Sequence, residues 1–285
     1  MPGSLPPWFF ALFAFLFGAL VGSFLNVVIA RVPRGQSIVH PPSRCPGCGH
    51  PIAWYDNVPL VSWLVLRGRC RACARAISPR YPFVELATAL LALACWRQFG
   101  PTPWAVAAFA FLAALVALTY IDLDHWLLPR SITIPFIALG LGASMLSGGP
   151  GFVSSALGAA VGFAAFVVLG FLAERILRKE ALGGGDVWLL AMIGAWLGLR
   201  ALLPVVLLAS VQGALVGGIL LAVARRRQRA TALPPPKPTG DAEIDDWEPP
   251  EGAIPFGPFL ALGAAEYLFF GERLVAWYLD LLTGV

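Results

Sequence analysis

The chain has 285 residues, of which 58% are hydrophobic and only 13% are charged, and its mean hydropathy is +0.76. A soluble domain carries about 25% charged residues, so this composition excludes a soluble globular protein and indicates a polytopic membrane protein. The net charge of +4 mainly reflects how basic residues are divided between the two sides of the membrane, so we expect no nucleic-acid binding.

Eight apolar stretches approach the length of about 20 residues that crosses a bilayer as a helix. We therefore predict an all-α polytopic membrane protein with about eight transmembrane helices. The first span is too long for a signal-peptide core and lacks a convincing cleavage site, so we expect it to remain as an anchor. The fourth and sixth spans are short. The predicted spans are 8–29, 83–99, 103–120, 132–147, 151–173, 187–199, 201–224 and 256–271.

The basic residues predict the orientation of these spans. The loops on one side of the membrane hold 17 of the 20 Lys and Arg; they are 30–82, 121–131, 174–186 and 225–255. The positive-inside rule places these loops in the cytoplasm and both termini outside. We accordingly divide the chain into a first transmembrane helix, a cytoplasmic cysteine-rich domain and a membrane-embedded domain that includes the charged cytoplasmic loop 225–255; their ranges are 1–30, 31–82 and 83–285.

Four of the five cysteines form two CxxC pairs with 21 residues between the pairs: Cys45 and Cys48, then Cys70 and Cys73. Two such knuckles supply four thiolates in a tetrahedron, so we predict a closed, structural zinc site. Gly47 and Gly49 permit the tight turn of the first knuckle. A redox dithiol is the alternative, which the cytoplasmic placement disfavours. His50 is an alternative ligand, and Cys95 is predicted to be a buried apolar residue.

Two aspartates lie at the ends of apolar stretches. Asp122 follows the apolar run 105–119, and Asp186 follows three glycines and precedes the run 187–199. Charged groups at the edge of a bilayer are costly and therefore candidates for function. Two carboxylates that converge can share one proton, which is what an acid protease needs to activate water. The alternative is that both are ordinary loop carboxylates, with the glycines forming a simple turn.

Several segments, in this order and combination, resemble the prepilin peptidases, which are type IV leader peptidases of bacterial pilus and type II secretion systems and GxGD-type membrane aspartyl proteases. The resemblance covers nearly the whole chain. The segments that carry it are 22–33, the two CxxC pairs, 78–85, 121–129, 183–186 and 254–261.

The resemblance implies a membrane aspartic endopeptidase of the bacterial inner membrane. Such an enzyme cuts the basic leader of prepilins and pseudopilins after glycine, on the cytoplasmic side. The family pattern places the first catalytic aspartate seven residues before Pro129, which selects Asp122 over its rival Asp124, and it makes Asp186 the second. Other residues expected to support the motifs are Gly183, Gly185, Asp124, Pro129 and Glu85. For Glu85, a simple helix cap at the membrane interface is the alternative.

Members with the cysteine loop often also methylate the new N-terminus with S-adenosylmethionine. No residue set here identifies a site for this cofactor, since GxGD is not a dinucleotide fingerprint, so this expectation rests on the resemblance alone. The alternative function is a non-enzymatic membrane assembly factor that docks secretion partners through the zinc loop. A transporter is disfavoured because most predicted spans contain few polar residues.

Overall fold

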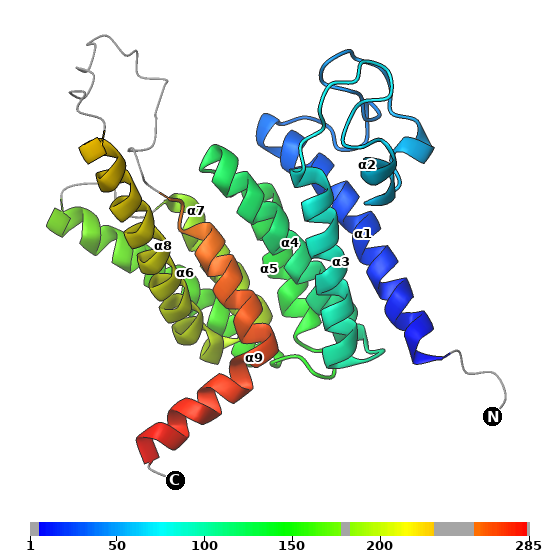
Figure 1. The fold of residues 1–285 in the computed structure, drawn as a ribbon. Helices are drawn as coiled ribbons and strands as arrows, with labels where there is room; N and C mark the ends of the chain where they lie inside the picture. The colour runs from blue at the N-terminus through cyan, green and yellow to red at the C-terminus, as the bar shows by residue number, and fades with distance from the viewer. Residues whose placement is uncertain (1–5, 178–182, 231–253, 284–285) are drawn as a thin grey trace.

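The computed structural model describes residues 6–177, 183–230 and 254–283. Within these ranges the regular structure is helical, with two isolated β-bridges in the cysteine loop (Figure 1). The long helices are α1 (Pro7–Arg31), α3 (Arg80–Phe99), α4 (Pro103–His125), α5 (Arg130–Ala143), α6 (Phe152–Leu177), α7 (Gly184–Leu197), α8 (Leu202–Ala230) and α9 (Gly257–Thr283). The short elements are α2 (Val61–Val65) and three 3₁₀ turns at Val32–Arg34, Trp54–Asp56 and Leu199–Ala201.

Each of the eight predicted spans coincides with one long helix, which confirms the predicted fold class. Four of the described helices, α1, α4, α6 and α8, are long and apolar enough to cross a membrane. The spans predicted to be short are α5 and α7, each of 14 residues. Residues 178–182 and 231–253, which include most of the predicted charged loop, lie outside the described residues.

Helices α1 and α3 pack with their backbones in close approach. A Cβ atom added to Gly18 would lie 2.8 Å from the Cα of Ala89, and one added to Gly22 would lie 2.7 Å from the Cα of Glu85. Small residues permit such crossings in membranes, where close van der Waals packing holds helices together. The crossing fixes the end of α1 that leads into the cysteine loop against the first turns of α3.

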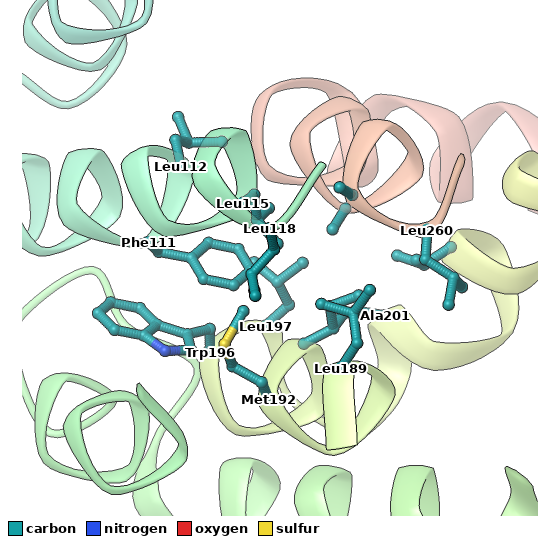
Figure 2. Close-up of a cluster of buried hydrophobic side chains, with 14 of the residues drawn as sticks. Phe111, Leu112, Leu115, Leu118, Leu189, Met192, Trp196, Leu197, Ala201 and Leu260 are labelled. Atoms are coloured by element: carbon teal, nitrogen blue, oxygen red, sulfur yellow. The ribbon is translucent and has the colours of Figure 1, made fainter. Parts of the chain in front are cut away.

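Helices α4 and α7 form the core of the remaining bundle. Both are apolar on nearly all faces, as expected of helices surrounded by other helices. Figure 2 shows the buried side chains through which they pack. Trp196 of α7 stacks on Phe111 of α4 with ring centroids 5.1 Å apart, and its Nε1 donates a 2.7 Å hydrogen bond to the carbonyl of Phe136 in α5. The core therefore joins the helix that ends near Asp122 to the helix that begins at the GxGD segment.

A second glycine crossing holds α6 against α7. A Cβ atom added to Gly194 of α7 would overlap the carbonyl oxygen of Gly158 in α6, and one added to Gly162 would lie 2.9 Å from the carbonyl oxygen of Leu190. The backbones of α6 and α7 are thus in direct contact. Together with the packing against α4 and α5, this contact fixes the position of α7.

Candidate functional site

Asp122 lies in the last turn of α4 and is only 5% exposed. The helix ends because Trp126 adopts a left-handed conformation (φ +52°), from which its N–H donates to the Asp122 carbonyl at 2.9 Å. Pro129 then stands at the N-cap of α5, where its missing N–H costs no helical hydrogen bond. The chain therefore leaves one helix and starts the next between Asp122 and Pro129.

Asp186 lies in the first turn of α7 and is 8% exposed. Gly183 is the N-cap residue, and the N–H of Asp186 donates to its carbonyl at 3.0 Å. A Cβ atom on Gly185 would lie 2.7 Å from the Cβ of Leu128, so only glycine permits this approach of α7 to the α4–α5 connection. The glycines of the GxGD segment therefore bring Asp186 towards the end of α4.

The two carboxylates come close enough for the charge of Asp122 to act on Asp186. Both are buried, and neither takes part in the two salt bridges found among the described residues. Two neighbouring buried carboxylates without a basic partner cannot both ionise cheaply, so protonation of one of them is favoured. This is the chemical state from which a pair of acids can activate water.

Gly257 is a site residue that the sequence did not assign. It is the first residue of α9, and its backbone N–H hydrogen-bonds the carboxylate of Asp122. A Cβ atom at this position would overlap Oδ2 of Asp122 and lie 3.3 Å from Cδ1 of Leu128. The segment 254–261 stood out in the sequence as a motif, but nothing in its pattern indicated which residue it contacts.

Asp124, the rival of Asp122, is engaged elsewhere. Its Oδ2 forms a 2.6 Å salt bridge with Nη1 of Arg80, the first residue of α3. The same guanidinium lies 4.5 Å from the ring centroid of Tyr120. This partly exposed ion pair fastens the end of α4 to the start of α3.

The four predicted metal ligands come together. One ligand atom from each of Cys45, Cys48, Cys70 and Cys73 lies within 4.8 Å of the others, and His50 is not part of this group. Such a set of four thiols can hold a metal ion.

The two knuckles have matching hydrogen bonds. The N–H of Cys45 donates to the carbonyl of His50 and that of Cys70 to the carbonyl of Arg75, both at 2.9 Å. The left-handed residue of each turn is Gly49 in the first knuckle (φ +71°) and Ala74 in the second (φ +56°). Of the two predicted turn glycines, only Gly49 adopts a positive φ.

The electrostatics of the knuckles favour thiolates unequally. Backbone N–H groups of Gly47 and Cys48 lower the pKa of Cys45 to about 6. The N–H of Arg75 favours the Cys73 thiolate, but desolvation and the other three thiols outweigh it and raise the pKa of Cys73 to about 11. A cation at the centre would stabilise all four thiolates, because metal ions deprotonate the thiols that bind them.

Glu85 is buried in α3 and joins the helix to the cysteine loop. Its Oε2 accepts a 2.8 Å hydrogen bond from the N–H of Leu60, which has a positive φ of 63°. Glu85 is not in the first turn of α3 and caps no helix, so the interpretation as an interfacial cap is wrong. Nothing in the sequence indicated Leu60 as its partner, since 25 residues separate them.

The family models and the most similar known proteins point to the same family. Residues 16–99 match the model of the bacterial peptidase A24 N-terminal domain, and residues 109–218 match that of the type IV leader peptidase family. The chain is 44% identical to the prepilin leader peptidase/N-methyltransferase of Myxococcus xanthus, over 95% of this chain and 94% of the relative. It is 38% identical to the protein of the same name from Aeromonas hydrophila, over 96% and 95% of the two chains. No solved structure matches. The motif resemblance is thereby confirmed, and the chain belongs to the type IV leader peptidase family.

Proposed function

We propose that this protein is a membrane aspartic endopeptidase that removes the basic leader of type IV prepilins and pseudopilins after glycine. The observation that carries the proposal is the pair of buried carboxylates, Asp122 from α4 and Asp186 from α7. The charge of Asp122 acts on Asp186, and neither acid belongs to a salt bridge among the described residues. The names of the relatives support the choice of prepilin as substrate.

In the proposed mechanism one water molecule lies between Asp122 and Asp186. The ionised carboxylate takes a proton from the water as its oxygen attacks the scissile carbonyl carbon. The protonated carboxyl group donates a hydrogen bond to the carbonyl oxygen, which gains negative charge in the tetrahedral intermediate. The C–N bond then breaks and the leaving amine takes a proton from the pair. Since the two acids are coupled, the starting proton belongs to the pair.

Gly257 has a positioning role in this mechanism. Its N–H donates to the Asp122 carboxylate from the start of α9, where the helix dipole also favours negative charge. The contact restricts the orientation of Asp122 without introducing a side chain between the two acids.

The orientation proposed here follows the basic residues, with the loops around 30–82, 121–131, 174–186 and 225–255 in the cytoplasm and the protein in the bacterial inner membrane. Asp122, Asp186 and the cysteine cluster then lie on the side where the basic leader of a membrane-inserted prepilin is cut. The proposed domains are the helix 1–30, the cysteine-rich 31–82 and the peptidase region 83–285.

Two further assignments belong to the proposal. The four thiols bind zinc in a structural role, because a closed set of four cysteines leaves no position for substrate. The chain also methylates the new N-terminal residue with S-adenosylmethionine, as the names of the relatives indicate. Nothing in the comparisons supports the alternative of a non-enzymatic assembly factor.

The decisive experiment is cleavage of a prepilin in membranes by wild type and by the variants Asp122→Asn, Asp186→Asn and Asp124→Asn, each at confirmed expression. Each of the first two should lose cleavage by at least about a thousandfold, because the amide can neither take nor share the proton. Asp124→Asn is the matched control and should retain most activity, since its ion pair is partly exposed. Full activity in both Asp122→Asn and Asp186→Asn would refute the mechanism and favour an assembly factor.

A further inference from the structure

The outer face of α2, in the cysteine loop, consists of exposed apolar side chains. Val61, Leu64 and Val65 occupy positions i, i+3 and i+4, which share one face of a helix. All three are more than half exposed, and Leu64 and Val65 reach 68% and 69%. Contiguous apolar patches on a protein surface mark interaction sites, so this face indicates one.

The opposite face of α2 is bound to the rest of the cysteine loop. The hydroxyl of Ser62 accepts the N–H of Val58 and donates to the carbonyl of Tyr55, both at 3.0 Å. The indole of Trp63 donates to the carbonyl of Ile77 at 3.3 Å. These bonds fix the orientation of α2, with its apolar face directed away from the loop.

The packing of α1 and α3 locates α2 along the direction of the helices. Gly22 of α1 lies against Glu85 of α3, as described above. Glu85 accepts the N–H of Leu60, the residue directly before α2, at 2.8 Å. The start of α2 therefore lies near the level of Gly22, which is nine residues, or about 14 Å, before the end of α1 at Arg31.

α1 gives the scale for depth in the membrane. Its apolar span begins at Trp8, and about 20 residues cross the apolar core, so the other boundary lies at about Val28. Gly22 is then about 9 Å inside this boundary. Interfacial segments insert to roughly 5–10 Å. Since α2 lies beside α1 and α3 and not beyond their ends, it is at the depth of the membrane interface (Figure 1).

The backbone around α2 is suited to this depth because its N–H groups have acceptors within the protein. Those of residues 60–62, 64 and 66–69 all donate to protein oxygens. Leu60 precedes the helix and cannot bond within it, and its N–H is satisfied by the buried carboxylate of Glu85. An unsatisfied N–H is costly in lipid, so these bonds permit insertion.

Basic residues follow the apolar face directly. Arg67 and Arg69 are exposed, and they belong to neither of the salt bridges in the described part of the chain. The segment 57–70 contains no acidic residue, so an anionic surface meets no local repulsion there. An apolar face next to exposed arginines is typical of segments that insert apolar side chains and place guanidinium groups among anionic headgroups.

We propose that α2 inserts into the cytoplasmic leaflet of the bilayer. Val61, Leu64 and Val65 lie at the boundary between headgroups and acyl chains, and Arg67 and Arg69 lie at the phosphates of anionic lipids. The cysteine loop is then attached to the membrane at α2 as well as through α1 and α3. The cytoplasmic side follows from the orientation proposed above, whereas insertion itself requires only that α1 crosses the membrane.

The test places a genetically encoded fluorescent amino acid at Leu64 of the full chain, in nanodiscs of phosphatidylcholine with brominated acyl chains, which quench by contact. Quenching at Leu64 should be at least about threefold stronger than at Gln36, since interfacial segments lie roughly 5–10 Å deep. Gln36 is the matched control because it is exposed and lies past the end of α1, where its N–H donates to the carbonyl of Arg31. Equal quenching at Leu64 and Gln36 would overturn the proposal.

Anionic lipid tests the two arginines. Brominated phosphatidylglycerol in place of phosphatidylcholine should increase quenching at Leu64, and the double variant Arg67→Gln with Arg69→Gln should lose this increase. The control is Arg200→Gln with Arg273→Gln, at exposed positions on the other side of the predicted membrane, and it should keep the increase. An increase that persists unchanged in the Arg67 and Arg69 double variant would refute their contact with lipid.

A protein partner is the alternative occupant of the apolar face of α2. A photoreactive amino acid at Leu64, irradiated in native membranes, should form adducts with phospholipid that mass spectrometry identifies. Adducts with a protein and none with lipid would overturn the proposal. Neither quenching nor crosslinking depends on prepilin cleavage, so their outcome is independent of the proposed function.

Discussion

Gly257 lies where any side chain would collide with the carboxylate of Asp122. Gly257→Ala should therefore displace either the carboxylate or the start of α9, and leader cleavage should fall by roughly a hundredfold, as expected when a catalytic group is misplaced by about 1 Å. Prepilin cleavage in membranes is the measurement.

Gly217→Ala is the matched control for this change. A Cβ atom at Gly217 of α8 meets no atom within 4 Å, so the same substitution should leave cleavage unchanged. Equal losses in Gly217→Ala and Gly257→Ala would show that the effect is not due to contact with Asp122.

At the scale of single residues the sequence predicted the groups with distinctive chemistry. Asp122 and Asp186 were identified because carboxylates at the ends of apolar runs are rare and costly. Gly257 and the partner of Glu85 were not assigned, because a backbone N–H carries no sequence signature. The partner of Glu266 was not assigned either; its carboxylate accepts a 2.6 Å hydrogen bond from Gln212 of α8.

The length of α7 determines the depth of the site. Its 14 residues span about 21 Å, which is less than the roughly 30 Å of a bilayer's apolar core. Its neighbour α6 has 26 residues and spans about 39 Å. Because Gly194 meets Gly158 and Leu190 meets Gly162, the first turn of α7, which carries Asp186, ends short of the last turns of α6.

The close contact between α6 and α7 predicts that the position of α7 is sensitive to substitution at Gly194. Gly194→Ala should force the two backbones apart and destabilise the protein by about 1–3 kcal/mol, as overpacking of a close contact does. Thermal unfolding in detergent should occur at a lower temperature, and cleavage should decrease because α7 carries Asp186.

The control for this substitution is Gly142→Ala in α5, where an added Cβ atom meets nothing within 4 Å. Alanine is a better helix former than glycine, so the unfolding temperature of this variant should be unchanged or higher. Lowered stability in Gly142→Ala would mean that the close α6–α7 contact is not the reason for a loss in Gly194→Ala.

We expect the structural order of the cysteine loop to depend on a bound metal. Among the described residues it has one short helix, and its backbone is held by turns, 3₁₀ turns and isolated bridges. We expect about one zinc per chain by elemental analysis. Removing zinc with a chelator should increase hydrogen exchange in 43–77, while α4 and α7 stay protected because their packing is independent of the metal.

Single cysteine variants test which cysteines bind the zinc. Cys48→Ser should lower the zinc content and expose the loop, because three thiolates bind zinc more weakly than four. Cys95→Ser changes a buried cysteine of α3 outside the cluster and should keep the zinc. Full zinc content in Cys48→Ser would contradict the proposed four-cysteine site.

At the scale of the whole molecule, the sequence by itself determined the class of fold, the number of long helices and the identities of the candidate acids and thiols. These follow from local signals: apolar length, the cost of charge in a membrane and the spacing of cysteines. Only the tertiary structure decided which distant residues meet. Asp122 meets Gly257, and Glu85 meets Leu60, because glycine crossings and helix ends bring α9 and the cysteine loop to them. Such contacts depend on close packing between helices, which no single segment of the chain specifies.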